Sequence, residues 1–139
     1  MEESEKENLF SNLKNVLESI IKDKRKNPKN LKVLNKFKAS INLGYQMDKD
    51  FYFWCNLIAE NGNYTISRGK LDDYDLILKH TPEDALNYHS GNYSTLHMLI
   101  KKNEFGFKKL RIEKGNTGNR RIGILLKLPK VFILDKIKY

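Results

Sequence analysis

Apolar residues near the start of the chain recur along one face of a helix. They are Leu9, Phe10, Leu13, Val16, Leu17, Ile20 and Ile21. This spacing of three or four residues predicts an amphipathic helix from Ser4 to Lys24, beginning in a capping box of Ser4 and Glu7 and ending before Asn27-Pro28. We expect the helix to pack on the rest of the domain, and the alternative is a lid or a membrane-surface anchor.

Four later segments show features that are typical of β-strands. They run from Phe37 to Tyr45, Phe51 to Ala59, Tyr64 to Arg68 and Tyr74 to His80. The second segment is apolar on both faces, which predicts a central strand covered on two sides. Asn61-Gly62 predicts a hairpin turn between the second and third segments. Because the connections are short, we expect the four strands to form an antiparallel meander covered by helices on one face.

The chain after His80 predicts two helices in succession. Thr81 can cap the first helix, and Pro82 suits its first position. Ser90-Gly91-Asn92 ends that helix, because glycine adopts the left-handed conformation readily. The second helix carries Leu96, Leu99 and Ile100 on one face.

A last strand and a last helix complete the predicted order of elements. Leu110 to Gly115 is predicted as the strand, and Ile122 to Leu134 as an apolar helix that Pro129 kinks or ends. Between them, Gly115 to Gly118 with two following arginines is similar to the GxxG loop of KH nucleic-acid domains. A KH loop joins two helices, however, and here an alternating segment precedes the glycine.

This order of elements resembles the sterol carrier protein-2 (SCP-2-like) lipid-binding domains. The resemblance rests on the strand before Thr81, the Thr-Pro-Glu-Asp helix start, the glycine after the first apolar helix, and the Leu-x-Ile-x-x-Gly strand before a last apolar helix. It extends over about Phe37 to Leu134. It implies an α+β fold, with a mostly antiparallel five-stranded sheet covered on one face by helices. It also implies an apolar tunnel for a lipid and no catalytic residue.

The resemblance further implies which positions line the tunnel. They are Leu76, Leu78, Leu86, Leu96, Leu99, Ile100, Leu125, Leu126, Leu128 and Phe132. On this hypothesis, a charged residue at Leu99 or Leu126 abolishes lipid uptake. From the residues alone, apolar helix faces as wide as these are more typical of ordinary core.

The charge balance points to an anionic partner without identifying it. The 26 lysines and arginines exceed the 17 acidic residues and give a formal net charge of +9. Eight of the basic residues lie between positions 22 and 38: Lys22, Lys24, Arg25, Lys26, Lys29, Lys32, Lys36 and Lys38. This run is typical of a solvated face, and its functional interpretation is a patch that docks on polyanions.

A second basic segment includes two aromatic residues and suggests contact with a membrane. Its proposed contact residues are Lys101, Lys102, Phe105, Phe107, Lys108 and Lys109. The phenylalanines can enter the membrane interface while the lysines bind anionic headgroups, at the mouth of the tunnel. The alternative is a loop whose phenylalanines turn inward.

The sequence shows no pattern that predicts catalysis or a cofactor. His80, His89 and His97 lie on different predicted elements, and neither paired metal-ligand spacings nor a phosphate-binding loop occurs. Cys55 lies in an apolar strand, which favours a small buried side chain over a nucleophile. We therefore expect neither enzymatic activity nor a cofactor.

The sequence accordingly predicts one domain over residues 1–139, made of a helix in 1–27 and a sheet with covering helices in 28–139. The acidic N-terminus and the single cysteine favour a cytoplasmic location. The predicted function is binding and transfer of a lipid (sterol, fatty acyl or isoprenoid), with an anionic membrane surface as a second partner. The alternatives are a basic nucleic-acid-binding domain, which we do not favour, and an interaction module with an apolar groove.

Overall fold

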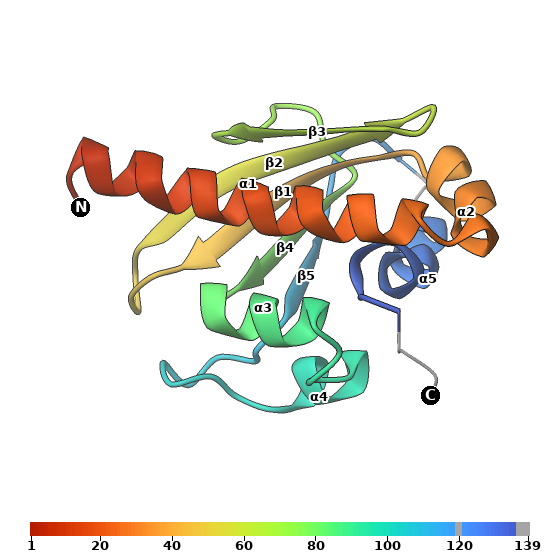
Figure 1. Cartoon of the computed structure of the whole chain (residues 1–139). Coiled ribbons are helices and arrows are strands. Elements are labelled where there is room, and N and C mark those ends of the chain that lie inside the picture. The colour runs from red at the N-terminus through yellow and green to blue at the C-terminus, as the bar shows by residue number, and fades with distance from the viewer. Residues whose placement is uncertain (119–120, 136–139) are drawn as a thin grey trace.

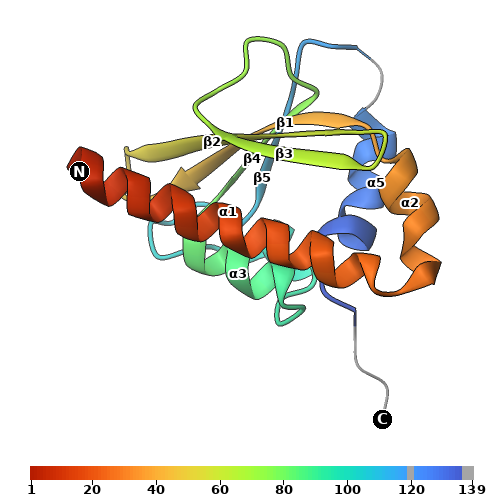
Figure 2. The same ribbon diagram turned by 45° about the horizontal axis from the view of Figure 1, so that its top comes forward.

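The computed structural model describes residues 1–118 and 121–135. Within these residues, helices pack on one face of a sheet whose strand order is β3-β2-β1-β4-β5 (Figures 1 and 2). The helical elements are α1 (Glu3–Arg25), the short 3-10 helix η1 (Pro28–Asn30), α2 (Leu31–Lys36), α3 (Pro82–His89), α4 (Thr95–Ile100) and α5 (Arg121–Phe132). The predicted α+β class, with a five-stranded sheet covered on one face, is confirmed.

The sheet is antiparallel except for one pair of strands. β1 (Ala39–Gln46) pairs antiparallel with β2 (Tyr52–Glu60), which pairs antiparallel with β3 (Asn63–Arg68). β4 (Leu76–His80) lies on the other side of β1 and runs parallel to it, and β5 (Arg111–Lys114) pairs antiparallel with β4. The predicted four-stranded meander is therefore wrong between the third and fourth strands.

Two buried asparagines explain this crossover. Asn42 of β1 accepts a hydrogen bond from the backbone N–H of Leu71 at 2.7 Å and donates one to the Leu71 carbonyl. Asn56 of β2 donates to the carbonyl of Gly69 at 3.0 Å. These bonds hold the loop after β3 against the face of the sheet opposite the helices. The loop thereby carries the chain over the sheet to the free edge of β1.

The two faces of the central strand β2 are covered in different ways. Phe53, Cys55 and Leu57 are buried under the helices, whereas Tyr52 and Trp54 point to the opposite, open face. There the Tyr52 and Trp54 rings stack with their centroids 6.0 Å apart. Cationic side chains lie over these rings, Lys70 over Trp54 and Arg111 over Tyr52. The second apolar face of β2 is thus covered by cations and loops, and not by a second layer of helices.

Helix α1 lies across the sheet and buries Leu17, Ile20 and Ile21 (Figure 1). The predicted helix is confirmed, but its capping box is wrong. The helix begins one residue earlier, after Glu2, and has no side-chain cap. Glu7 instead forms an ion pair with Arg68 of β3, which draws its carboxylate away from the helix end.

The predicted start of the first middle helix agrees with the structure. The Thr81 hydroxyl accepts a hydrogen bond from the backbone N–H of Asp84 at 3.1 Å, and Pro82 is the first residue of α3. Ser94 caps α4 in the same way, accepting from the N–H of His97 at 3.0 Å. The short α4 buries Met98 but turns its leucines outward.

Helix α5 closes the core at one end of the sheet, beside α2 (Figures 1 and 2). Ile124, Leu128, Val131 and Phe132 are buried, and the helix continues through Pro129 to Phe132. The GxxG segment follows β5 and so does not join two helices as a KH loop does. Arg120 lies outside the described residues. In the part of the chain that is described, no helix is long and apolar enough to cross a membrane.

Candidate functional site

An internal cavity of about 30 Å³ lies where the helices meet the sheet. Its lining comes from β1, β2, β4, α1, α3, the start of β5 and α5: Leu17, Ile41, Leu43, Tyr45, Leu57, Leu78, His80, Tyr88, His89, Leu110, Leu128 and Phe132. The lining side chains are aliphatic or aromatic hydrocarbons, except for two tyrosines and two histidines. The cavity is therefore an apolar space with a few neutral polar groups.

The volume of this cavity is far below that of an occupied lipid site. A cavity of about 30 Å³ has room for one or two water molecules. Pockets that hold a small-molecule ligand measure roughly 300–1,000 Å³. The described residues thus enclose a small apolar cavity between the sheet and the helices, and they form no open tunnel.

Two histidines supply most of the polarity of the cavity. His80 ends β4 and is 3% exposed, and its Nδ1 has no hydrogen-bond partner among the described residues. Burial lowers the pKa of His80 to about 3, with the neighbouring His89 as a smaller cause. Burial likewise lowers the pKa of His89, although its hydrogen bond to Phe132 opposes this. Both imidazoles are therefore neutral at physiological pH.

A surface groove shares one lining residue with this cavity. It is open, measures about 620 Å³ and lies between α1, α3 and the residues after α5. Val16 and Ile20 line it on the α1 side, and Leu86 and His89 line it on the α3 side. His89 is shared, because it lines both the groove and the internal cavity. His89 therefore borders both the solvent-open groove and the internal cavity.

The structure separates the ten predicted lining residues. Leu78, Leu128 and Phe132 line the cavity, and Leu76 is fully buried nearby in β4. Leu125 packs against the edge of the core. The other five are exposed and do not line the cavity: Leu86, Leu96, Leu99, Ile100 and Leu126. The predicted set therefore does not form one lining in this structure.

The reason for this outward placement is clearest in α4. Leu96, Leu99 and Ile100 follow the i, i+3, i+4 spacing of one helix face, and that face points to solvent. Met98 lies on the opposite face and is completely buried. A regular apolar spacing locates a stripe on a helix, but it does not say whether the stripe faces the core. We call Leu96, Leu99 and Ile100 the α4 stripe.

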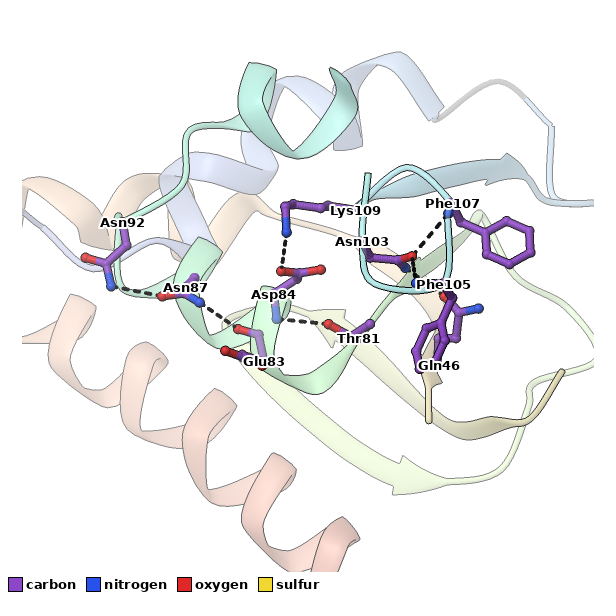
Figure 3. Close-up of polar contacts among 10 residues, drawn as sticks. All are labelled: Gln46, Thr81, Glu83, Asp84, Asn87, Asn92, Asn103, Phe105, Phe107 and Lys109. Atoms are coloured by element: carbon purple, nitrogen blue, oxygen red, sulfur yellow. Dashed lines mark hydrogen bonds and ion pairs between the residues drawn. The ribbon is translucent and has the colours of Figure 1, made fainter. Parts of the chain in front are cut away.

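The neighbouring segment from Lys101 to Lys109 is a loop built around Asn103 (Figure 3). The Asn103 side-chain oxygen accepts hydrogen bonds from the backbone N–H groups of Phe105 and Phe107, at 2.9 and 3.1 Å. Its amide donates to Gln46 Oε1 of β1 at 2.9 Å. In Figure 3 the Phe107 ring extends away from this polar cluster. The loop is thus fixed to the sheet with Phe107 at the surface.

The four lysines of this loop differ in how accessible they are to a lipid headgroup. Lys101 and Lys102 are exposed, and the Lys108 ammonium donates to the Ile100 carbonyl at 2.8 Å. Lys109 instead forms an ion pair with Asp84 of α3 at 2.9 Å, with side chains that are 16% and 8% exposed. Because Lys109 is paired with the buried Asp84, its ammonium group is not free to bind a lipid headgroup as the membrane-contact hypothesis expects (Figure 3).

The basic run at positions 22–38 also forms a defined surface feature. An open pocket of about 480 Å³ lies between the end of α1, η1, α2 and α5. Its lining includes five lysines: Lys24, Lys29, Lys32, Lys36 and Lys130. Asp135 is the acidic residue of this lining, and its hydrogen bond from Lys24 lowers the pKa of the carboxyl group. We call these residues the lysine pocket.

The described residues contain no cluster of three or more His, Cys, Asp or Glu side chains that could hold a metal ion. Cys55 is 1% exposed, and burial raises the pKa of its thiol to about 12. A thiol this inaccessible and this weakly acidic is not an effective nucleophile. The arrangement is chemically suited to enclosing an apolar group, and not to a reaction at Cys55.

Several cavity residues were not predicted as site residues from the sequence. Tyr45, Leu57 and Leu110 alternate correctly for the buried face of their strands, so their burial could be inferred. His80 and His89 gave no comparable signal, because a single histidine on each of two elements is common. Their proximity depends on α3 folding back over the end of β4.

The fold matches that of sterol carrier protein 2 structures. The sterol carrier protein domain 2 of Helicoverpa armigera shares 14% identity, with a TM-score of 0.58 over 87% of this chain and 89% of that one. The ubiquinone synthesis protein UbiJ-SCP2 shares 10% identity, with a TM-score of 0.55 over 88% of each chain. Sterol carrier protein 2 from Yarrowia lipolytica, in its apo form, shares 13% identity, with a TM-score of 0.51 over 84% of this chain and 88% of that one.

Sequence comparison gives no further assignment, since no protein-family model and no curated protein sequence matches the chain. At 10–14% identity, the structural matches establish the fold alone. The predicted resemblance to the SCP-2-like architecture is confirmed at that level.

Proposed function

We propose that this chain is a non-enzymatic lipid carrier that holds an apolar ligand between its sheet and its helices. The observation that carries the proposal is the apolar cavity at the centre of a sterol carrier protein-2 fold. The groove that meets this cavity at His89 supports it further. Burial of the lipid's hydrocarbon chain is a sufficient driving force for binding, because each buried CH₂ contributes about 0.8 kcal/mol.

Lipid entry requires the cavity to enlarge about tenfold, since ligand pockets start near 300 Å³. We assign this enlargement to a displacement of α5, which contributes Leu128 and Phe132 to the lining. The helix contains Pro129, which has no N–H to donate to the preceding turn. Movement of one helix end enlarges the cavity while leaving the sheet intact.

The groove between α1 and α3 is the proposed path for the ligand. Leu86 and Leu134 are exposed apolar residues in its lining, and His89 forms its inner end. A lipid tail that follows this groove exchanges solvent contact for apolar contact before it reaches the core. Leu86 thus acts in lipid binding at the entrance, and not in the internal cavity.

A membrane surface is the proposed source of the lipid. The α4 stripe and Phe107 present exposed apolar groups beside the exposed Lys101 and Lys102. Apolar groups flanked by cations match an anionic bilayer, whose headgroups attract lysine at about 1 kcal/mol per charge. The cytoplasm is the proposed location, because Cys55 has no disulfide partner and a reducing compartment suits it.

Two substitutions in α5 test the carrier proposal. Leu128 lines the cavity, whereas Leu126 is 71% exposed two residues earlier in the same helix. We expect Leu128→Trp to fill the site and reduce uptake of a fluorescent fatty acid or sterol at least tenfold. Leu126→Trp adds the same side chain outside the cavity and should bind like the wild type. Equal uptake by both folded variants contradicts a ligand in this cavity.

A vesicle assay tests the membrane contact. The triple change of Leu96, Leu99 and Ile100 to serine removes the α4 stripe without altering any charge. We expect it to weaken co-sedimentation with vesicles of 30% phosphatidylserine at least fivefold. Replacement of Phe105 and Phe107 by serine should have a smaller effect, because only Phe107 is at the surface. Unchanged sedimentation of the triple variant argues against this docking face.

The lysine pocket favours polyanion binding as a second candidate function. Four lysines around this depression, in addition to the Lys24 that pairs with Asp135, attract phosphate groups, including those of nucleic acids. Such binding should weaken steeply as salt rises and should be lost when Lys32 and Lys36 become glutamate. RNA binding that persists in this variant, or that is indifferent to salt, contradicts the candidate.

A further inference from the structure

His80 is a buried polar residue at the wall of the internal cavity, and its Nδ1 has no hydrogen-bond partner among the residues that the structure describes. An unpaired buried polar atom is destabilising by about as much as a lost hydrogen bond, and most such atoms in native proteins are paired. The adjacent His89, by contrast, has its Nδ1 bonded to the carbonyl oxygen of Phe132.

The remaining lining limits which group can pair with His80. Among the described residues, no lysine, arginine or carboxylate lines the cavity, and the other polar groups of its lining are the hydroxyls of Tyr45 and Tyr88 and the imidazole of His89. The Tyr88 hydroxyl is already bonded to Thr95 Oγ1 at 2.9 Å. An ionised headgroup at this position would be buried without a counter-ion, which is unfavourable by several kcal/mol in general. A neutral headgroup meets no such penalty.

We propose that His80 is the polar anchor of the site, and that it hydrogen-bonds the hydroxyl group of a neutral lipid alcohol. This inference rests on the proposed carrier function. A hydroxyl both donates and accepts, so it pairs with a neutral imidazole in either tautomer. Burial, which lowers the pKa of His80 to about 3, keeps the ring neutral at pH 7.

The positions of the two histidines give the ligand a direction. His80 lines the cavity and not the groove, whereas His89 lines both. A hydroxyl at His80 is therefore at the inner end, and the apolar tail extends past His89 towards the groove between α1 and α3. The ligand enters with its hydroxyl first and its tail nearest the solvent.

A comparison of two ligands tests this anchor. The probes are 1-decanol and 1-fluorodecane, which have the same number of heavy atoms but differ in the hydroxyl. Their dissociation constants are measured at pH 7.5 by titration calorimetry for the wild type, His80→Phe and His97→Phe. His97 is the matched control, because its Nε2 is also buried and unpaired but it does not line the cavity.

We expect His80→Phe to shift the ratio of the two dissociation constants about tenfold against the alcohol, the value of one hydrogen bond. His97→Phe should leave the ratio unchanged. A ratio that is the same in all three proteins overturns the anchor while leaving the carrier proposal intact. Failure of both probes to bind the wild type contradicts the carrier proposal itself. Decanoate binding more tightly than 1-decanol overturns the assignment of a neutral hydroxyl.

Imidazole ¹⁵N spectra of the wild-type protein give a second measurement that needs no variant. Saturation with 1-decanol should move the His80 ring signals, and saturation with 1-fluorodecane should move them less. The His97 signals should respond to neither probe. His80 signals that are unchanged with bound 1-decanol show that a structural water, and not the ligand, serves this nitrogen, and they overturn the proposal.

Discussion

His89 Nδ1 lies 2.8 Å from the carbonyl oxygen of Phe132, so the imidazole N–H of α3 donates to the end of α5. The backbone N–H of Leu134 donates in return to the carbonyl of His89 at 2.9 Å. These two bonds join α3 to α5 at the place where the groove meets the internal cavity. Opening the site by moving α5 therefore requires that this connection breaks.

The first prediction concerns this connection. His89→Leu removes the side-chain hydrogen bond and leaves the Phe132 carbonyl without its donor. We expect the free energy of unfolding to fall by about 1–2 kcal/mol in urea titrations. Lipid uptake followed by stopped-flow fluorescence should become faster, because α5 is less firmly held. His97→Leu is the control, and it should leave the rate of uptake unchanged. If His89→Leu takes up lipid more slowly than the wild type, α5 is not the moving element.

The second prediction compares two glycines. A Cβ on Gly115 would lie 1.9 Å from the carbonyl oxygen of Tyr74, whereas a Cβ on Gly123 of α5 meets nothing within 4 Å. We expect Gly115→Ala to destabilise the protein by about 3 kcal/mol or more, because rigid backbone must move. Gly123→Ala should stabilise it by about 0.5–1 kcal/mol through helix propensity. Thermal unfolding checks both, and similar effects of the two changes would contradict the packing at Gly115.

The third prediction concerns pH. Burial lowers the pKa of His80 from 6.5 to about 3 and also lowers that of His89, so the unfolded chain binds more protons than the folded one below pH 6.5. The stability that neutral His80 contributes is present above pH 6.5 and is lost as the pH falls towards 3. The contribution of His89 is lost in the same direction below pH 6.5. A histidine that becomes protonated on unfolding should remove up to about 1.4 kcal/mol per pH unit. The free energy of unfolding, measured in urea from pH 7.5 to 5, should show this loss. Its slope against pH should be shallower in His80→Gln than in the wild type, and equal slopes contradict the prediction.

The fourth prediction concerns the buried pair of Asp84 and Lys109. Removing one partner leaves the other charge unpaired, so Asp84→Ala and Lys109→Met should each destabilise the protein by about 3 kcal/mol. The double variant should be less destabilised than the sum of the two. A double-mutant cycle from urea unfolding measures the coupling. Additive effects would mean that Lys109 is free at the surface, as the membrane-contact hypothesis required.

Local signals in the sequence predicted much of the fold. Thr81 with Pro82 identified the start of α3, and Asn61 with Gly62 the hairpin, where both residues have positive φ. These features act within a few residues of each other. The parallel pairing of β4 with β1 was missed, because it depends on Asn42 and Asn56 binding a loop far along the chain.

The candidate site was predicted less completely than the fold. The SCP-2-like resemblance implied Leu128 and Phe132 as lining residues, and both lie at the cavity. It implied the α4 stripe as well, yet that stripe faces solvent because Met98 takes the buried face. The contributions of His80 and His89 follow from tertiary packing, which brings the end of β4 and the end of α3 to one cavity.

Native mass spectrometry of the purified protein, followed by organic extraction and identification of what is released, tests the carrier function most directly. We predict one bound lipid per chain, or its stoichiometric uptake from added sterol, fatty acid or long-chain alcohol, and loss of that mass in Leu128→Trp but not in Leu126→Trp. A protein that stays free of ligand after incubation with all three would contradict the carrier function. The cavity would then be ordinary core, and salt-dependent binding at the lysine pocket would be the function to test.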